Sequence, residues 1–290
     1  MLDVVDRIQI AAGDALEAAK GWETLLGARP VGEDEVTCLG ARRYTYRLGQ
    51  SEVEFLEPNG SGAVHDAMQK RGRAHIFAAG ASTPDPAALK AHFEQSGISH
   101  HEEQGQIHAL MPNPAGNDFR FVLSKSSEGD SVGEIDFLYE VTLLGGDCRG
   151  LEAELVRLFE LDAEVFCPIK SDTFGYEGKL TLFDKDRLHR FEVITPWTSD
   201  TTMGRFLERQ GDCFYMAFAQ TASMPLIEER AREAGAPITV DRPDDRAPGQ
   251  TPDQMWLHPA ALGGVMLGLS RPTMAWKWSG HPERVEGVVV

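Results

Sequence analysis

The chain has 290 residues, 42% hydrophobic and 25% charged, as is typical of a globular protein with room for two domains. Its formal net charge of −17 argues against a nucleic acid or an anionic membrane as partner, because both would repel it. The sequence shows no apolar run that could span a bilayer and no signal peptide, and its 4 cysteines are scattered, so we expect a cytoplasmic protein with reduced thiols.

Helical periodicity appears four times along the chain. The first helix is predicted between a cap at Asp14 and a stop at Gly27, and the second over residues 86–96. Leucines at 151, 155 and 158 mark the third helix, and residues 224–234 form the fourth. Short segments of strand character follow, at residues 42–48, 51–56, 179–183 and 189–194. The predicted order is a strand, a helix and several strands, four times over.

The second half of the chain repeats the first. The matching segments are VVDRIQIAAG (4–13) with FLYEVTLLGG (137–146), VEFLEP (53–58) with FEVITP (191–196), RAHIFAAG (73–80) with DCFYMAFA (212–219), and NPAGNDFRFVLS (113–124) with HPAALGGVMLGLS (258–270). The matches keep their order, so one ancestral unit appears twice. A polar, glycine- and serine-rich stretch is the predicted linker. We expect domains at 1–124 and 136–272, a linker at 125–135 and a tail at 273–290.

The repeated order resembles the vicinal oxygen chelate superfamily, which includes glyoxalases, epimerases and extradiol dioxygenases. The motifs that carry the resemblance are DRIQIAAGD (6–14), HIFAAG (75–80), NPAGNDFRF (113–121) and HPAALGGVMLGL (258–269). It covers nearly the whole chain. It implies an α+β fold of tandem vicinal oxygen chelate domains, built from four βαβββ modules that form cupped mixed sheets around a site.

Side chains alternate between the two faces of a strand, which places a set of polar residues on one face. Alternation by itself favours an antiparallel sheet with that face in water, whereas the resemblance implies that the same face lines the cup. The superfamily draws its metal ligands from the first, fourth, fifth and eighth strands of a domain. These positions hold Arg7, Glu54, His75 and Arg120 in the first domain, and Glu140, Glu192, Phe214 and Gly268 in the second.

Neither domain supplies three metal ligands by itself, so the pairing of modules decides the ligand set. Pairing across the two halves, as in glyoxalases, would bring His75 and Arg120 together with Glu140 and Glu192. In that case His75, Glu140 and Glu192 are the candidate ligands of a divalent Mn, Ni, Co, Zn or Mg ion. Pairing within each half remains the alternative.

The other cup of the cross-paired arrangement would hold Arg7 and Glu54 and no metal. A simpler interpretation is that Arg7 with Glu54, and Arg120 with a glutamate, form ordinary buried ion pairs.

We expect a glyoxalase- or epimerase-like lyase or isomerase that acts through a metal-stabilised enolate on a small oxygenated or acyl substrate. Glu140 or Glu192 would move a proton at the carbon next to the carbonyl, and Arg120 would hold a carboxylate or stabilise the oxyanion.

In a version without metal, Glu54 and His75 would shuttle protons while Arg7 and Arg120 replace the cation. Two further functions stay open. One is a non-catalytic, sequestering small-molecule-binding protein of the same fold. The other is an extradiol-type ring-cleaving dioxygenase, which is weaker because that chemistry wants iron held by two histidines and a carboxylate. We expect no nucleotide cofactor, and a homodimer remains an option.

Overall fold

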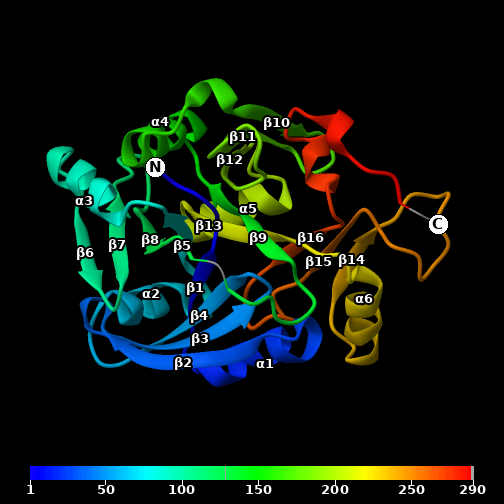
Figure 1. Cartoon of the computed structure of the whole chain (residues 1–290), viewed down its shortest axis with the longest axis horizontal. Coiled ribbons are helices and arrows are strands. Elements are labelled where there is room, and N and C mark those ends of the chain that lie inside the picture. The colour runs from blue at the N-terminus through cyan, green and yellow to red at the C-terminus, as the bar shows by residue number, and fades with distance from the viewer. Residues whose placement is uncertain (128, 289–290) are drawn as a thin grey trace. The chain divides into compact units, whose positions relative to one another are not determined.

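The computed structural model describes residues 1–127 and 129–288. In that part of the chain, six α-helices accompany two mixed eight-stranded sheets (Figure 1). The first sheet has the spatial order β2 (Arg29–Val36), β3 (Ala41–Leu48), β4 (Ser51–Pro58), β1 (Arg7–Ala11), β5 (His75–Thr83), β8 (Phe119–Lys125), β7 (Gln106–Met111), β6 (His100–Glu103). The second has the same order, β10 (Cys167–Ser171), β11 (Tyr176–Leu182), β12 (Arg190–Pro196), β9 (Phe137–Leu144), β13 (Cys213–Gln220), β16 (Leu267–Ser270), β15 (Gln254–Leu257), β14 (Ile238–Asp241).

The four predicted helices are confirmed. They are α1 (Ala15–Leu26), α3 (Pro86–Gln95), α4 (Cys148–Phe159) and α6 (Met224–Glu233). Asp14 caps α1 by accepting a hydrogen bond from the Glu17 amide, and Gly27 ends the helix with a left-handed φ of 71°. Each helix follows the first strand of a four-strand module, so the βαβββ order occurs four times.

Two further helices, α2 (Ala63–Arg71) and α5 (Thr202–Gln210), join successive modules and were not predicted. α2 carries almost no apolar stripe, whereas α5 is short and its apolar residues Met203, Phe206 and Leu207 pack together on one face. Val64 is the buried residue of α2, and Met203 and Gly204 are those of α5.

Each sheet comes from one half of the chain, but packing groups the modules differently. The first compact unit, unit 1, contains Met1–Val5, Ala78–Ser127 and Glu140–Tyr215. Unit 2 contains Asp6–Phe77 and the described residues 129–139 and 216–288. Each unit thus combines one module from each half of the chain, as in the cross-half alternative. The domain boundaries expected from the sequence stay a prediction.

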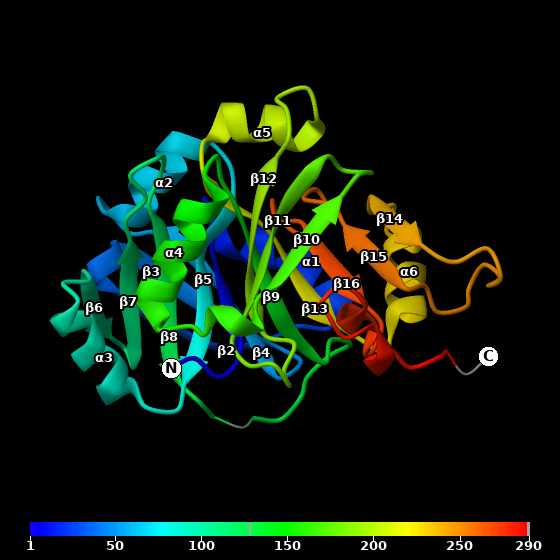
Figure 2. The same cartoon turned by 90° about the horizontal axis from the view of Figure 1, so that it is seen from above.

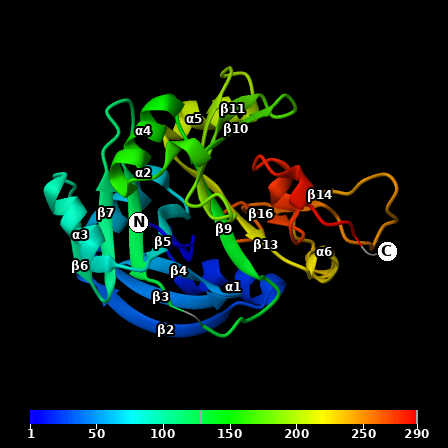
Figure 3. The same cartoon turned by 45° about the horizontal axis from the view of Figure 1, so that its top comes forward.

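In unit 1, the third module packs against the second through a helix. α4 covers β11 and β12 of its own module and also lies against β7 (Figure 2). Its buried face consists of Leu151, Leu155, Leu158 and Phe159. The ring of Phe159 meets that of Phe121 on β8 edge to face at 5.2 Å. α3, which lies beside β6 in Figure 3, contacts β8 in the same unit.

A buried carboxylate fastens the two modules of unit 1 at a turn. Asp212 accepts a hydrogen bond from the Asn113 side chain at 2.6 Å and another from the Gly146 amide at 3.2 Å. Asn113 belongs to the NPAGND turn of the second module, and Gly146 to the strand-to-helix turn of the third. A methyl group on Gly116 would lie 2.5 Å from Asp212 Oδ2, so a larger residue there would displace the Asp212 carboxylate.

In unit 2, the first module packs against the fourth in a comparable way. α1 lies against β3 and β4 and also contacts α6 (Figures 1 and 3). Trp22 donates its indole N–H to the Leu262 carbonyl at 3.2 Å. A methyl group on Gly21 would lie 1.9 Å from the Ala261 oxygen, so α1 rests directly on the HPAALGG turn. Corresponding turns of the repeat therefore join modules from different halves in both units.

Within the described residues, no helix combines the length and apolar character needed to cross a lipid bilayer. The polar side chains on the predicted face of the strands do not lie in water: Glu54, Glu140 and Glu192 are buried, and Arg7, His75 and Arg120 are half-buried. The expectation of a sheet with one face in water, which alternation by itself favoured, is therefore wrong at these strands.

We predict that Asp212→Ala lowers the free energy of unfolding by about 1–3 kcal/mol, because it leaves buried donors from two modules without an acceptor. Urea unfolding followed by circular dichroism measures the change. Asp172→Ala is the matched control in the same unit, since its side chain is 80% exposed and a surface ion pair contributes about 0–1 kcal/mol. Equal effects of the two substitutions would contradict the role of Asp212.

Candidate functional site

Two neighbouring parallel strands of unit 1 carry a buried cluster of charged groups. β9 pairs with β12 so that Glu140 lies opposite Arg190 and Thr142 lies opposite Glu192. We call Glu140, Thr142, Arg190 and Glu192 the Glu192 cluster; their exposed fractions are 2%, 0%, 0% and 6%. Because paired residues point to the same face, all four side chains meet.

Hydrogen bonds hold the Glu192 cluster in one arrangement. Arg190 Nε donates to Glu140 Oε2 at 2.6 Å, and Arg190 Nη1 donates to the Leu188 carbonyl at 3.0 Å. Thr142 donates its hydroxyl proton to Glu192 Oε2 at 2.5 Å. Glu140 is therefore compensated by a guanidinium, while Glu192 accepts its hydrogen bond from a neutral hydroxyl.

The two carboxyl groups consequently differ in their affinity for a proton. Burial raises the pKa of Glu192 well above its ordinary value, and the nearby charge of Glu140 raises it further. A hydrogen bond with Glu140, which only the protonated form of Glu192 can donate, acts in the same direction. The hydroxyl of Thr142 and the charge of Arg190 oppose the shift but do not cancel it. Glu192 therefore holds a proton to unusually high pH.

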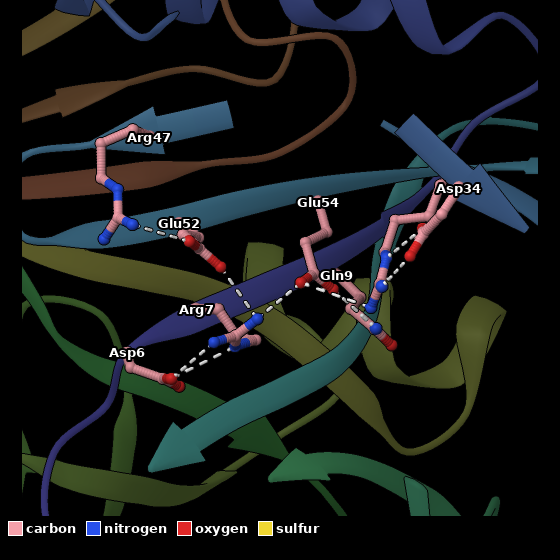
Figure 4. Close-up of polar contacts among 8 residues, drawn as sticks. Asp6, Arg7, Gln9, Asp34, Arg47, Glu52 and Glu54 are labelled. Atoms are coloured by element: carbon pink, nitrogen blue, oxygen red, sulfur yellow. Dashed lines mark hydrogen bonds and ion pairs between the residues drawn. The ribbon is translucent and has the colours of Figure 1, made fainter. Parts of the chain in front are cut away.

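The first module in unit 2 carries a related cluster with different charges (Figure 4). We call it the Glu54 cluster; it consists of Arg7, Gln9, Arg43 and Glu54 with Asp6, Asp34, Arg47 and Glu52. Glu54 accepts hydrogen bonds from Arg7 Nη1 at 2.7 Å and from the Gln9 amide at 2.8 Å. Arg43 Nη1 lies 3.7 Å from the same carboxylate. Burial favours the protonated form of Glu54, but the charges of Arg7 and Arg43 and the Gln9 bond outweigh it, so its pKa is lowered.

The two clusters occupy equivalent positions in the repeat. β1 and β4 place Arg7 opposite Glu52 and Gln9 opposite Glu54, in the same parallel register as Glu140–Arg190 and Thr142–Glu192. In the first pair of each cluster, arginine and glutamate have exchanged strands. In the second pair, a neutral donor, Gln9 or Thr142, faces a glutamate in both copies.

A neighbouring strand helps to explain why the pKa values of Glu54 and Glu192 shift in opposite directions. β3 places Arg43 opposite Leu56, and the equivalent residue of β11 is Gly178, opposite Ile194. A side chain at Gly178 is excluded, because its Cβ would lie 2.0 Å from the Val193 oxygen. Glu54 thus has two guanidinium groups near it, whereas Glu192 has Arg190, which also serves Glu140. Equivalent glutamates are held ionised in one unit and protonated in the other.

The other predicted site residues lie on the expected strands but outside the Glu192 cluster. His75 begins β5 in the part of that strand that belongs to unit 2, and its Nδ1 donates to the Arg73 carbonyl at 2.9 Å. Burial lowers the pKa of His75 to about 4, so its imidazole is neutral near pH 7. Arg120 lies half-buried on β8 of unit 1, opposite Leu110. The structure does not assign His75 to the unit that holds the two acids, and the predicted ligand triad stays a prediction.

The two remaining ligand positions serve packing. The Phe214 ring on β13 meets that of Phe119 edge to face at 5.1 Å. Gly268 on β16 leaves space for Phe218, whose ring would lie 2.2 Å from a methyl group there. Sequence reasoning recognised both positions as lacking ligands but did not identify these neighbours.

Sequence reasoning also missed the roles of Arg190, Thr142 and Tyr176. Alternation places Arg190 on the face of Glu192, but its bond to Glu140 depends on the register between β9 and β12, which no local pattern reveals. Tyr176 on β11 is half-buried, and burial followed by the charges of Glu192 and Glu140 raises its pKa.

The Glu192 cluster does not fit a metal ion. One of its two carboxylates accepts a short hydrogen bond from the buried guanidinium of Arg190, and a divalent cation bound there would be repelled at close range. Arg190 already supplies the positive charge that a metal would bring to the site.

Comparison with known proteins extends no further than the fold. No protein-family model and no curated protein matches the chain. Among solved structures, a mutant of 4-hydroxymandelate synthase from Streptomyces coelicolor matches 98% of this chain and 99% of its own, with a TM-score of 0.68 and 12% identity. A xylose isomerase-like TIM barrel/4-hydroxyphenylpyruvate dioxygenase fusion protein matches 93% of this chain, with a TM-score of 0.63 and 12% identity.

This chain spans about half of the fusion protein, 49% of its length. At 12% identity, both likenesses establish a shared fold and leave activity undetermined.

We predict that the pH dependence of stability changes in Glu192→Gln. Because the pKa of Glu192 is raised by folding, wild-type stability falls as pH rises from the ordinary glutamate pKa to the folded value, by about 1.4 kcal/mol for each pH unit between them. Glutamine lacks this titration, so Glu192→Gln should gain stability relative to wild type between pH 5 and pH 8. Urea unfolding at both pH values measures the free energy of unfolding of the two proteins. An equal change with pH in wild type and Glu192→Gln would contradict the raised pKa of Glu192.

The equivalent substitution Glu54→Gln should have the opposite effect. It leaves Arg7 and Arg43 with less compensating charge in a buried cluster, which costs about 3 kcal/mol at pH 7. Because the pKa of Glu54 is lowered by folding, its contribution is present above the ordinary glutamate pKa and is lost as pH falls through the folded value. The same unfolding experiment at pH 7 and pH 3 tests this, and a Glu54→Gln protein as stable as wild type at pH 7 would refute it.

Proposed function

Starting from the tandem vicinal oxygen chelate fold, which the chain shares with these solved structures, we propose that unit 1 is the catalytic centre of a metal-independent isomerase or lyase. It would transfer a proton at a carbon next to a carbonyl group of a small oxygenated substrate. The observation that carries the proposal is the pair of buried carboxyl groups, Glu140 and Glu192, held in contrasting environments on adjacent strands. Such pairs commonly divide acid–base roles.

Glu192 is the proton carrier in this proposal. A glutamate with a raised pKa is a stronger base when it is ionised than an ordinary carboxylate, and it can return the proton at a higher pH than an ordinary carboxyl group can. Thr142 orients the carboxyl group through its hydroxyl. Glu140 contributes by disfavouring the ionised form of Glu192 and by holding Arg190 in position.

The reaction can be balanced with these groups. Ionised Glu192 takes the proton from the carbon, and the C–H electron pair moves toward the carbonyl to form an enolate. The guanidinium of Arg190 compensates the charge that develops. Return of the proton to the other face of the same carbon completes an isomerisation at that carbon. In an α-hydroxy ketone, the hydroxyl proton can pass to the enolate oxygen while Glu192 returns its proton to the former carbonyl carbon, so that the carbonyl and hydroxyl groups exchange places. Loss of a leaving group from the next carbon completes an elimination, and Glu192 then gives its proton to water.

The two solved structures favour a second candidate, a dioxygenase, because one is named as such and is similar over 93% of this chain. Adding iron(II) and 4-hydroxyphenylpyruvate to the full chain and recording oxygen uptake tests this candidate. We expect no uptake above that of iron without protein, since the Glu192 cluster does not fit a metal. Protein-dependent uptake would favour the dioxygenase and replace our proposal.

We predict that the full chain, dialysed against EDTA, exchanges the proton next to the carbonyl of at least one compound in a panel of small 2-oxo acids and α-hydroxy ketones. Proton NMR in deuterium oxide measures the loss of the C–H signal. Glu192→Gln should slow this exchange about 100-fold or more, because the proton carrier is absent. The rate should rise with pH through the raised pKa of Glu192, and Glu140→Gln should shift that rise to lower pH.

Glu177→Gln is the matched control, because Glu177 is an exposed residue of β11 and its loss should leave the exchange rate unchanged. Exchange that survives in Glu192→Gln, or that appears only when metal is added, would overturn the proposal. Binding of panel compounds without any exchange would instead support the sequestering function.

A further inference from the structure

We propose that the hydroxyl of Tyr176 holds the substrate oxygen that becomes negatively charged, an inference that rests on the proposed function of unit 1. Tyr176 is the first residue of β11 and lies opposite Pro196 of β12. β11 places Leu180 directly opposite Glu192. Tyr176 precedes Leu180 by four residues, so side-chain alternation puts it on the same face of the sheet as Glu192.

Packing fixes the position of the Tyr176 ring on this face. The ring packs against a small apolar cluster of Leu144, Ile194 and Met203. Leu144 and Ile194 each follow a member of the Glu192 cluster by two residues, on β9 and β12 respectively, so the ring lies next along the same face. Tyr176 is therefore anchored on the face that carries the acids, next to the residues that follow them on β9 and β12.

The electrostatic surroundings of Tyr176 agree with this placement beside both acids. Burial raises the pKa of its hydroxyl, and the charges of Glu192 and Glu140 raise it further. The phenol therefore stays protonated throughout the range in which Glu192 titrates. A group that keeps its proton beside a base can donate a hydrogen bond without competing for the transferred proton.

The hydroxyl of Tyr176 is also available to a ligand. Among the described residues, none forms a hydrogen bond with it, and the side chain is half-buried. In contrast, the hydroxyl of Thr142 and the guanidinium of Arg190 are already engaged within the cluster. Tyr176 thus offers a donor near the proton carrier that is not committed to a described neighbour.

This placement defines the class of substrate. Glu192 acts on a C–H bond, and Tyr176 would donate to an oxygen on the adjacent carbon, so the ligand must carry a carbonyl next to the reacting carbon. As the enolate forms, its oxygen becomes a stronger acceptor, and the hydrogen bond from Tyr176 strengthens in the transition state. A 2-oxo acid or an α-hydroxy ketone has this arrangement.

The experiment uses the full chain labelled with 3-fluorotyrosine and follows the fluorine NMR signal that Tyr176→Phe removes. That signal should shift with pH at the midpoint of Glu192 titration, and the shift should vanish in Glu192→Gln. Tyr215 is the matched comparison, because it packs against the same apolar cluster while its pKa responds to burial and to Cys213. A Tyr176 signal that ignores Glu192 would overturn the placement.

Kinetics then separates this inference from the function on which it rests. Tyr176→Phe should lower kcat for proton exchange about 100-fold with little change in KM, the usual cost of removing one donor to an oxyanion, while Tyr215→Phe keeps the wild-type rate. If wild type exchanges and Glu192→Gln does not, but Tyr176→Phe is fully active, the role of Tyr176 is wrong and the proposed function stands. If wild type exchanges no compound, the proposed function itself fails.

Discussion

The buried ion pair between Arg190 and Glu140 is the interaction on which the properties of unit 1 depend. It sits on adjacent parallel strands with both partners almost wholly removed from water. Such a pair is costly to desolvate and tolerable when its hydrogen bonds are satisfied. Arg190 bonds directly to Glu140 and not to Glu192, so it only partly opposes the burial and the charge of Glu140 that raise the pKa of Glu192.

The repeat provides an internal comparison for this effect. Glu54 and Glu192 stand at equivalent positions, and each accepts a hydrogen bond from a neutral side chain on the neighbouring strand. Their pKa values shift in opposite directions. Two differences contribute. Arg7 bonds directly to Glu54, whereas Arg190 bonds to Glu140, and Arg43 approaches Glu54 where the backbone of the other copy excludes any side chain at Gly178. Glu54 in the first copy is therefore held in its ionised form, while Glu192 in the second copy keeps its proton to higher pH.

In the proposed function, the same arrangement takes the place of a metal ion. A metal in such a site would neutralise carboxylates and stabilise an enolate. Here Arg190 provides a permanent positive charge, and the proposed hydrogen bond from Tyr176 adds a directional donor. The positions of Phe214 and Gly268, where the resemblance implied metal ligands, are committed to packing aromatic rings. A ligand side chain at either position would therefore disturb this packing.

The sequence by itself determined the four helices, the order of the modules and the strands that carry the polar residues, because periodicity and capping are local properties. It also identified Glu140 and Glu192 as candidates. The tertiary structure decided which groups those acids meet. Parallel register joined Arg190 to Glu140, packing brought modules of different halves into one unit, and burial set the protonation of Glu192. Register, packing and burial depend on residues far apart in the chain, so no local pattern could specify them.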